Sequence, residues 1–350
     1  MKIGKIMKNI KIHSRPIGDG APCYIIAEIG NLFQNFTEAK RLIDSALEIN
    51  VNAIKFQTWD AETLTTKKNF FDLEVTGNVS QYEFHKSIQI TEKLQDDIVK
   101  YAKEKNMTIF SAPSHMNDIE VMEKMDLPVF KIGSDLACHL PILKRVAKLQ
   151  KPIILSTGMC TMDEIRKSVN TIYNEGNQEL ILLHCVSDYP AKIEESNLNV
   201  IYEMKKEFDT PIGFSDHSIG SLVPLSAAMI GANVIEKHMK HPENSVSPDD
   251  SHALNPEQFS DLIKSIRLVE SAKGSGKKVP SISEEKNLKT NRVSIIAMQE
   301  IKKGTKITTE MIDIRRPGSG IMPYYYDDVL SKTAKLDISK ETPITWDMIE

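Results

Sequence analysis

The chain has 350 residues, of which 41% are hydrophobic and 26% are charged, a composition typical of folded globular proteins. Its formal net charge of −4 gives no reason to expect a nucleic-acid partner. The longest uncharged stretch, 218–235, is interrupted by proline, glycine and polar residues, and residues 1–15 lack an apolar segment, so we expect neither a membrane span nor a secretory signal.

Eight short runs rich in Ile, Val, Leu and Phe recur through the first two-thirds of the chain. They do not alternate strictly between apolar and polar residues, which is typical of parallel strands buried on both faces. The runs lie at residues 24–30, 53–58, 107–113, 129–134, 152–158, 180–186, 211–217 and 234–239.

Amphipathic helical patterns separate these runs. The first follows residue 37 and places Leu42, Ile43, Ala46 and Ile49 on one face. Eight strand–helix repeats predict one closed (β/α)₈ barrel, a TIM barrel, rather than an open sheet. The segment 60–95, between the second and third runs, is long enough to carry its own helix or lid.

Three helix starts carry capping signals. Thr37 is the expected N-cap of the first helix. Thr161 with Glu164 has the spacing of a capping box, and Asn255 precedes Pro256, a residue favoured in the first helical turn.

The composition changes after residue 272. A Gly-, Ser- and Lys-rich stretch indicates a linker, and short β-like runs follow from about residue 292. We therefore expect a barrel domain at 1–275, a linker at 276–291 and a small β-rich module at 292–350. Because about 60 residues bury little apolar surface, this module should pack on its own barrel or on a partner chain.

Four cysteines, Cys23, Cys138, Cys160 and Cys185, include no CxxC pair. Their spacing is typical of reduced thiols in a cytoplasmic protein. We interpret all four as small buried apolar side chains.

Polar side chains stand at the end of every predicted strand. In a (β/α)₈ barrel these ends converge on the active site, so we expect a polar ligand at this mouth. The polar residues at these ends are Glu28, Lys55, Gln57, Ser111, Lys131, Ser134, Ser156, Thr157, His184, Ser187, Tyr189, Ser215, Asp216, His217, Glu236, Lys237 and His238.

Two of these residues, Lys55 and Lys131, lie inside predicted strands, where an unpaired charge would be costly. One interpretation is that they face an anion such as a phosphate or a carboxylate. The alternative is a buried salt bridge with Glu28 or Glu236. The many accompanying hydroxyls favour the anion site.

His217 and His238 end consecutive strands and can share one ligand. Two imidazoles with water and an oxygen ligand suit Mn²⁺, Co²⁺ or Zn²⁺. The alternative for each is a hydrogen-bonded core histidine. His241 and His252 lie nearby, and we interpret them as solvated loop residues.

Several short motifs follow one another along the chain. They are AEIG (27–30), KFQ (55–57), KIGS (131–134), ILSTGM (154–159), LLHC (182–185), GFSDHS (213–218), IEKH (235–238) and RRPGSG (315–320). As a set they resemble the sialic acid synthase family, which includes N-acetylneuraminate, legionaminate and pseudaminate synthases, and the resemblance covers nearly the whole chain.

The resemblance implies a TIM barrel followed by a C-terminal antifreeze-like (SAF, β-clip) domain. In the family this domain reaches the active site of the neighbouring subunit in a domain-swapped homodimer. The implied activity is that of a transferase: metal-dependent condensation of phosphoenolpyruvate with an N-acylated amino-hexose aldehyde to a nonulosonic acid and phosphate. We expect Mn²⁺ as the metal, with Mg²⁺ or Co²⁺ as alternatives.

The resemblance also implies roles for single residues. His217 and His238 match the metal ligands, and Glu28 and Glu236 are the candidate catalytic carboxylates. Phosphoenolpyruvate contacts are matched by Lys55, Lys131, Ser134, Ser156 and Ser215. Sugar contacts are matched by Gln57, Asn78, Tyr189, Asp249 and, for the N-acyl group, Arg316. Ser111 and Ser187 are further substrate-binding candidates at strand ends.

The chain departs from the family pattern near the sugar and phosphate sites. Leu32, Phe33 and Asn35 replace an Asn-His pair and a Gly, Ala112 stands where a Thr is usual, and Leu136 stands where a Glu is frequent. The sequence therefore does not name the sugar. Two alternatives stay open: a synthase for a phosphorylated sugar, and a degenerate barrel that binds carbohydrate or acts as a scaffold.

Overall fold

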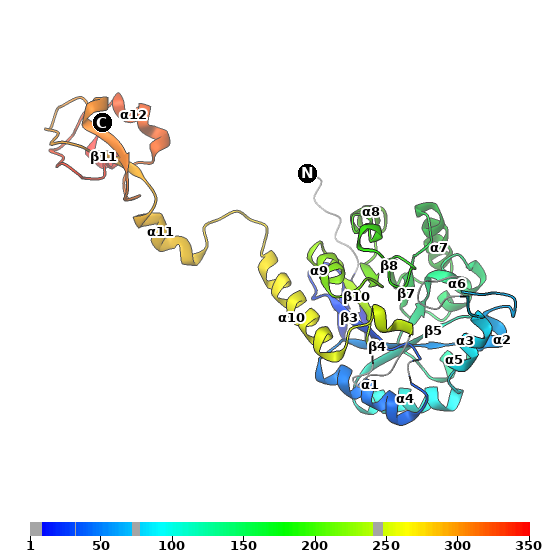
Figure 1. Ribbon diagram of the computed structural model, residues 1–350. Helices are drawn as coiled ribbons and strands as arrows, with labels where there is room; N and C mark the ends of the chain where they lie inside the picture. The colour runs from blue at the N-terminus through cyan, green and yellow to red at the C-terminus, as the bar shows by residue number, and fades with distance from the viewer. Residues whose placement is uncertain (1–8, 32, 72–77, 241–247) are drawn as a thin grey trace. The chain divides into compact units, whose positions relative to one another are not determined.

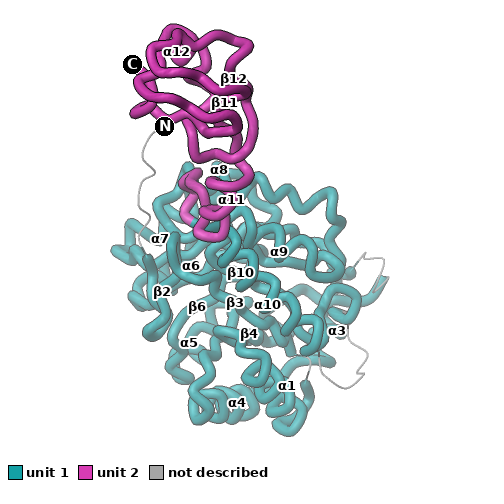
Figure 2. Tube along the Cα trace, turned by 90° about the vertical axis from the view of Figure 1, so that its left-hand side faces the viewer, with its two compact units in different colours: residues 1–274 teal, residues 275–350 magenta. Residues whose placement is uncertain are grey.

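The computed structural model describes residues 9–31, 33–71, 78–240 and 248–350. The chain divides into two compact units, residues 1–274 and residues 275–350, which are coloured separately in Figure 2. Leu32 and His241, both discussed above, lie outside the described residues.

Unit 1 is a closed barrel of eight parallel strands with helices around it (Figure 1). All eight predicted runs form its strands, so the predicted TIM barrel is confirmed. The strands are β3 (Tyr24–Glu28), β4 (Ala53–Thr58), β5 (Thr108–Pro113), β6 (Phe130–Ile132), β7 (Ile153–Ser156), β8 (Leu180–Cys185), β9 (Ile212–Asp216) and β10 (Val234–His238).

Helices connect successive strands, and their apolar faces pack against the outward side chains of the barrel in one large cluster. The segment 60–95 carries two short helices of its own, α2 and α3, as expected. The helices of unit 1 are α1 (Phe36–Glu48), α2 (Ala61–Leu64), α3 (Gln81–Ser87), α4 (Glu92–Glu104), α5 (Met116–Lys124), α6 (Leu140–Ala147), α7 (Met162–Asn174), α8 (Val200–Glu207), α9 (Leu222–Met229) and α10 (Pro256–Lys273).

Two of the three predicted helix starts are confirmed. Thr161 forms a capping box at the start of α7, and Asn255 caps α10. The N-cap of α1 is Asn35 and not Thr37, because the Asn35 side-chain oxygen accepts the Glu38 N–H at 3.1 Å. The earlier start gives α1 one more apolar residue at its beginning.

The inward side chains change character along each strand. Toward the N-terminal ends they form an apolar layer, closed by a hairpin of β1 (Ile10–Ile12) and β2 (Arg15–Ile17) that the sequence patterns did not predict. Two to four residues further along, the inward positions of most strands are polar, with Ala112 on β5 as an exception, so the ligand-facing end of the barrel rests on a solid apolar floor. The apolar layer consists of Ile10, Ile12, Ile17, Tyr24, Ile26, Ala53, Phe110, Val129, Ile154, Ile181, Leu183 and Val234.

Unit 2 has a small core of its own, built mostly from isoleucines. Its strands β11 (Ser294–Ala297) and β12 (Ile312–Arg315) pair in antiparallel fashion, and α12 (Tyr326–Leu330) packs beside them through Val329. A short helix, α11 (Glu285–Thr290), lies within the segment interpreted from sequence as a linker.

The cysteines do not all follow the sequence interpretation. Cys23 and Cys185 are buried, as expected, whereas Cys138 is exposed and Cys160 is only half-buried. The interpretation as buried apolar side chains is therefore wrong for Cys138.

Within the described part of the chain, no helix combines the length and the apolarity that a membrane crossing requires.

Candidate active site

A cavity of about 640 Å³ opens at the C-terminal ends of the barrel strands. Its lining draws on the ends of all eight strands and on the segment 60–95. The structure brings twelve of the sequence-predicted site residues together here: Lys55, Gln57, Lys131, Ser134, Ser156, Ser187, Tyr189, Ser215, His217, Glu236, His238 and Asp249.

The alternation of a β-strand decides which strand-end residues face this cavity. Glu236 and His238 are two residues apart and both line it, while Lys237 between them points the other way. Lys237 is fully buried and its ammonium bonds to the Asp216 carboxylate on the neighbouring strand. The expectation that Lys237 and Asp216 join the mouth is therefore wrong.

His184 is a second case of this kind. It follows Leu183, a residue of the inner apolar layer, and its Nε2 lies 2.9 Å from the carbonyl oxygen of Ser196. It is a satisfied buried histidine and not a ligand-facing one.

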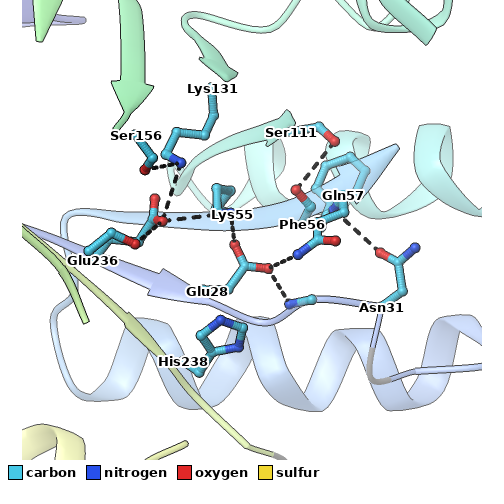
Figure 3. A network of polar contacts seen from close by, with 12 residues as sticks. Glu28, Asn31, Lys55, Phe56, Gln57, Ser111, Lys131, Ser156, Glu236 and His238 are labelled. Carbon is cyan, nitrogen blue, oxygen red and sulfur yellow. Dashed lines mark hydrogen bonds and ion pairs between the residues drawn. The ribbon is translucent and has the colours of Figure 1, made fainter. Parts of the chain in front are cut away.

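A row of ion pairs connects β3, β4, β6 and β10 at the cavity, above the apolar layer (Figure 3). The Lys55 ammonium contacts the Glu28 carboxylate and lies 3.7 Å from Glu236 Oε1. Lys131 Nζ lies 3.4 Å from the same Glu236 oxygen and 2.8 Å from Ser156 Oγ. Both carboxylates named in the salt-bridge alternative are thus partners of Lys55.

These ion pairs do not rule out an anion site. The two separations to Glu236, 3.4 and 3.7 Å, exceed the usual 2.7–3.2 Å of an N–H···O hydrogen bond. Each ammonium carries three donors. Lys55 and Lys131 both line the cavity and can therefore donate to an anion that enters it.

Two buried oxygens at the cavity have no hydrogen-bond partner among the described residues. They are Glu236 Oε2 and Ser187 Oγ, and both residues line the cavity. Buried polar atoms in folded proteins nearly always have a partner, so these two oxygens mark positions that a ligand or water completes.

Burial and neighbouring charges set the ionisation of the array. Burial lowers the pKa of Lys55 to about 8, against the opposing effect of Glu236. Burial alone would raise the pKa of Glu236, but the charges of Lys131 and Lys55 outweigh it and lower that pKa to about 2. Glu236 is therefore ionised across the physiological range.

Glu28 does not line the cavity but contacts groups that do (Figure 3). Its Oε1 accepts the Gly30 N–H at 2.6 Å and lies 3.4 Å from Gln57 Nε2. Asn31 Oδ1 in turn accepts the Gln57 N–H at 3.3 Å. These contacts orient the Lys55 and Gln57 side chains toward the ligand space.

Histidines gather on the side of the cavity formed by β9 and β10. The rings of His217 and His238 have centroids 5.5 Å apart, and the Tyr189 ring lies 4.2 Å from that of His217. His217 Nδ1 lies 2.8 Å from the carbonyl oxygen of Val186, and His238 Nδ1 lies 3.1 Å from Asp249 Oδ2. Each imidazole thereby keeps Nε2 for another partner.

His252 belongs to the same group, and its interpretation as a solvated residue is wrong. It is 1% exposed, and its ring centroid lies 4.7 Å from that of His238. One donor atom each from His238, Asp249 and His252 lie within 4.8 Å of one another, a spacing that suits a single metal ion. The triad shares His238 with the predicted His217–His238 pair. Asp249 and His252 are three residues apart, which was the available sequence signal.

The donor set fits a divalent metal. Burial lowers the pKa of His217 and of His238, and it lowers the pKa of His252 to about 3. All three imidazoles are therefore neutral, the form that binds a metal. His252 Nε2 is buried without a hydrogen-bond partner among the described residues and lies 3.9 Å from Asp249 Oδ1.

Besides Glu28, two predicted site residues of unit 1 do not line the cavity. Ser111 is fully buried, and its hydroxyl lies 2.7 Å from Thr58 Oγ1, so the geometry does not favour a ligand role. Asn78 is exposed and is not among the cavity-lining residues. Arg316 is exposed in unit 2, and its assignment to the sugar stays a prediction.

The departures from the family pattern fall in two environments. Phe33 and Leu136 are buried in the core between the barrel and its helices, away from the ligand space. Ala112 lines the cavity. Leu136 does not line it, but the residue before it, Asp135, does.

One wall of the cavity was missed by sequence reasoning. It comes from the segment 60–95 and the strand end before it, where the aromatic residues had no recognisable motif, and it mixes apolar side chains with Thr65, Asn69, Gln81 and His85. Its apolar members are Trp59, Leu64, Phe71, Phe84 and Ile88.

Comparison with known families gives two matches. The model of the NeuB family matches residues 42–278, and the SAF domain matches residues 292–350.

Individual relatives cover nearly the whole chain. An N,N'-diacetyllegionaminic acid synthase of Campylobacter jejuni is 35% identical and aligns with 89% of this chain and 95% of its own length. A protein of the same name from Legionella pneumophila is 33% identical over 98% and 99% of the two chains. The crystal structure of N-acetylneuraminic acid synthetase from Leptospira borgpetersenii superposes with a TM-score of 0.71 at 28% identity, covering 81% of this chain and 95% of that one.

Proposed function

This chain belongs to the NeuB family, and its relatives include an N,N'-diacetyllegionaminic acid synthase. We propose that it condenses phosphoenolpyruvate with an N-acylated amino-hexose aldehyde. The products are a nonulosonic acid and phosphate. The observation that carries this proposal is the buried array of Lys55, Glu236 and Lys131, which lines the mouth of a (β/α)₈ barrel.

Lys55 and Lys131 hold the carboxylate and phosphate groups of phosphoenolpyruvate. Both ammonium groups are almost completely buried, so their attraction for an anion is weakly screened. Ser134, Ser156 and Ser215 add hydroxyl groups around the same space. Ser134 Oγ already accepts the Gly158 N–H at 2.9 Å, and its own proton can be donated to a ligand oxygen.

The formal charge of the site supports a metal ion as a second component. Two lysines face four carboxylates, which gives a formal charge of −2 before any ligand enters. A multiply charged anion such as phosphoenolpyruvate needs further positive charge to bind there. The residues counted are Lys55, Lys131, Glu28, Glu236, Asp135 and Asp249.

His217, His238, Asp249 and His252 are the residues that would hold this ion, for which we propose Mn²⁺ with Mg²⁺ or Co²⁺ as alternatives. When bound, a divalent cation supplies Lewis-acid polarisation of the acceptor aldehyde. The Asp249 carboxylate fixes the His238 ring through Nδ1, and the Val186 carbonyl fixes His217 in the same way.

Side chains of this protein take up a proton and position the reacting groups during the condensation. The enol carbon of phosphoenolpyruvate attacks the aldehyde carbon, and the aldehyde oxygen takes up a proton to become a hydroxyl group. Water adds to the adjacent carbon and loses a proton, and the tetrahedral intermediate expels phosphate by breaking its carbon–oxygen bond to the phosphate group. Glu236 is ionised, lines the cavity and keeps Oε2 without a partner, so it is placed to take the proton of that water. Glu28 does not line the cavity and acts by positioning Lys55 and Gln57.

The sugar occupies the outer part of the cavity. Gln57, Tyr189 and Asp249 line the cavity and are the residues assigned to the sugar, and Ser187 offers a hydroxyl oxygen that has no hydrogen-bond partner among the described residues. The N-acyl group is assigned to Arg316 of a partner chain in a domain-swapped homodimer, which rests on the family resemblance and on the SAF match. A cytoplasmic location, expected from the cysteines, stays a prediction.

A phosphate-release assay tests the proposal. Phosphoenolpyruvate is offered with a panel of N-acylated amino-hexoses, their 6-phosphates, and unacylated hexoses as controls. We expect release only with N-acylated acceptors without a phosphate group, and loss of release in strong chelator. Release only with the 6-phosphates would establish the phosphorylated-sugar synthase instead. No release with any acceptor from metal-loaded protein would favour the carbohydrate-binding or scaffold function.

A further inference from the structure

Two thiols that the proposed chemistry does not use lie next to each other in two neighbouring loops that also contribute residues to the cavity lining. Cys138 Sγ and Cys160 Sγ are 3.8 Å apart, although the residues are 22 positions apart in the chain. Cys138 is exposed and Cys160 is half-buried, so a small reagent can reach the pair from solvent.

Neighbouring elements fix the two thiols in this arrangement. Cys138 lies in the loop from β6 to α6, one residue before His139, the N-cap of α6. Cys160 lies in the loop from β7 to α7 and immediately precedes Thr161, the N-cap of α7. β6 and β7 are paired neighbours in the barrel, and α6 and α7 pack against each other, so both loops start and end on adjacent elements.

A disulfide needs only a modest movement from this geometry. Its sulfur atoms are about 2.05 Å apart, so the two sulfurs must approach by roughly 1.8 Å, within the reach of a side-chain rotation. The same two loops are already joined at their bases, where the Gly158 N–H bonds to Ser134 Oγ at 2.9 Å.

We propose that Cys138 and Cys160 form a reversible disulfide modification site that joins the β6–α6 and β7–α7 loops, made by exchange with a low-molecular-weight disulfide. This inference does not depend on the proposed condensation activity. Met159, the residue before Cys160, lines the cavity, and so does Ser134 on the other loop. The bridge therefore ties together two loops that both contact the ligand space.

The exchange proceeds in two balanced steps. Cys138 loses its proton to solvent and its thiolate attacks one sulfur of the oxidant, whose S–S bond breaks and whose other half leaves as a thiol. Cys160 then loses its proton and attacks the Cys138 sulfur of the mixed disulfide, and the second half of the oxidant leaves as a thiol. Two electrons and two protons pass from the cysteine pair to the oxidant, which is reduced to two thiols.

The environments of the two sulfurs set the order of attack. Cys138 is the exposed partner and meets the oxidant first. Burial raises the pKa of the Cys160 thiol to about 12, and the hydrogen bond with Cys138 acts in the same direction. Cys160 therefore stays protonated while Cys138 reacts, and it serves as the resolving thiol.

The test equilibrates the full-length protein in buffers of reduced and oxidised glutathione, followed by alkylation and peptide mass spectrometry. We expect one linked peptide pair, Cys138 with Cys160, and a fall from four free thiols to two, reversed by dithiothreitol. Cys23 and Cys185 should remain thiols because both are buried. The inference is overturned if folded protein keeps four thiols at the most oxidising ratio, or if a different pair is linked.

Single variants test the order of attack in protein that cannot close the bridge. Cys160→Ser should trap one glutathione per chain, on Cys138. Cys138→Ser should acquire glutathione at Cys160 at least about tenfold more slowly, because the attacking thiolate is scarce there. Equal rates in the two variants would overturn the assignment of Cys138 as the attacking thiol. Circular dichroism of both variants checks that each retains the barrel.

Discussion

The two ends of the barrel both place lysines beside a cavity, but the partners of those lysines differ. At the N-terminal end, a cavity of about 450 Å³ is lined by Lys103 and Lys151. Lys103 Nζ donates to the carbonyl oxygens of Met125 and Asp126 at 3.0 and 3.1 Å, and Lys151 Nζ donates to that of Leu127 at 2.8 Å and to the Asp126 carboxylate at 2.7 Å. Each of these two ammonium groups makes two hydrogen bonds to the loop 125–127.

At the C-terminal end, Lys55 and Lys131 are buried and share one carboxylate oxygen of Glu236 at longer distances. Backbone carbonyls contribute little there, since the nearest one to Lys131 Nζ is 3.5 Å away. A count of basic residues would therefore not separate the two ends. What separates them is the kind of partner: loop carbonyls and the exposed Asp126 carboxylate at the N-terminal end, and buried carboxylates at the C-terminal end.

The largest effect expected from this contrast is on turnover. Lys131→Met should lower the rate of phosphate release by about 10²–10³-fold, because it removes a buried charge that stabilises the reacting anion. Lys151→Met, the matched change at the other end of the barrel, should leave the rate unchanged. Steady-state phosphate release measures both. Similar losses in the two variants would show that lysine removal acts through stability and not through the site.

A smaller effect is expected on metal affinity. His252→Ala should weaken binding by about 10–100-fold, because it removes a buried imidazole next to His238 and Asp249. His13→Ala, at the N-terminal end of the barrel, should not change it. Competition between the protein and a chromophoric chelator measures affinity without turnover. Unchanged affinity in His252→Ala would remove this residue from the metal site.

The pH dependence of phosphoenolpyruvate binding should follow Lys55. Its pKa is lowered to about 8, so the ammonium charge is present below that pH and is lost as the pH rises through it. Affinity should therefore fall above pH 8, by up to about tenfold per pH unit. Calorimetric titrations at several pH values measure this fall.

Lys55→Arg provides the control for this titration. Arginine keeps its charge throughout, so any residual binding in the variant should lose the step near pH 8. Glu236 cannot produce the step, since its pKa is about 2. A step of equal size in Lys55→Arg would assign it to another group.

The smallest effect is expected at the apolar floor. Ile12→Val removes one buried methylene from the hairpin that closes the barrel, and it should lower the free energy of unfolding by about 0.5–1.5 kcal/mol with turnover unchanged. Ile193→Val, at an exposed position, should have no effect on either quantity. Denaturant titration measures the difference. A change in turnover at Ile12 would mean that the two ends of the barrel are coupled.

The sequence predicted the eight strands because parallel barrel strands are apolar on both faces and short. It also predicted most of the cavity residues, since the ends of parallel strands converge. It could not assign inward and outward positions at single strand ends, so Lys237, Asp216 and His184 were placed at the mouth. A shift of one residue along a strand turns a side chain from the inside of the barrel to the outside. Strand sequences that do not alternate between apolar and polar residues give no sign of which side chains point inward.

Other features depended on tertiary contacts that no local pattern records. His252 follows a polar loop, and its burial comes from packing against His238 and Tyr189. The β1–β2 hairpin consists of two three-residue strands, too short to give a periodic signal. Asn35 and Thr37 are both good capping residues, and only the folded chain shows that Asn35 is the N-cap of α1.

The most direct test of the central claim follows the carbon atoms of phosphoenolpyruvate. The wild-type protein is given phosphoenolpyruvate labelled with ¹³C at its three carbons, an N-acylated amino-hexose and Mn²⁺, and the products are analysed by mass spectrometry. We expect one product that carries all three labelled carbons joined to the intact sugar, with one phosphate released for each molecule formed. Phosphate released with the labelled carbons recovered as pyruvate would contradict it, because the site would then hydrolyse phosphoenolpyruvate without forming a carbon–carbon bond.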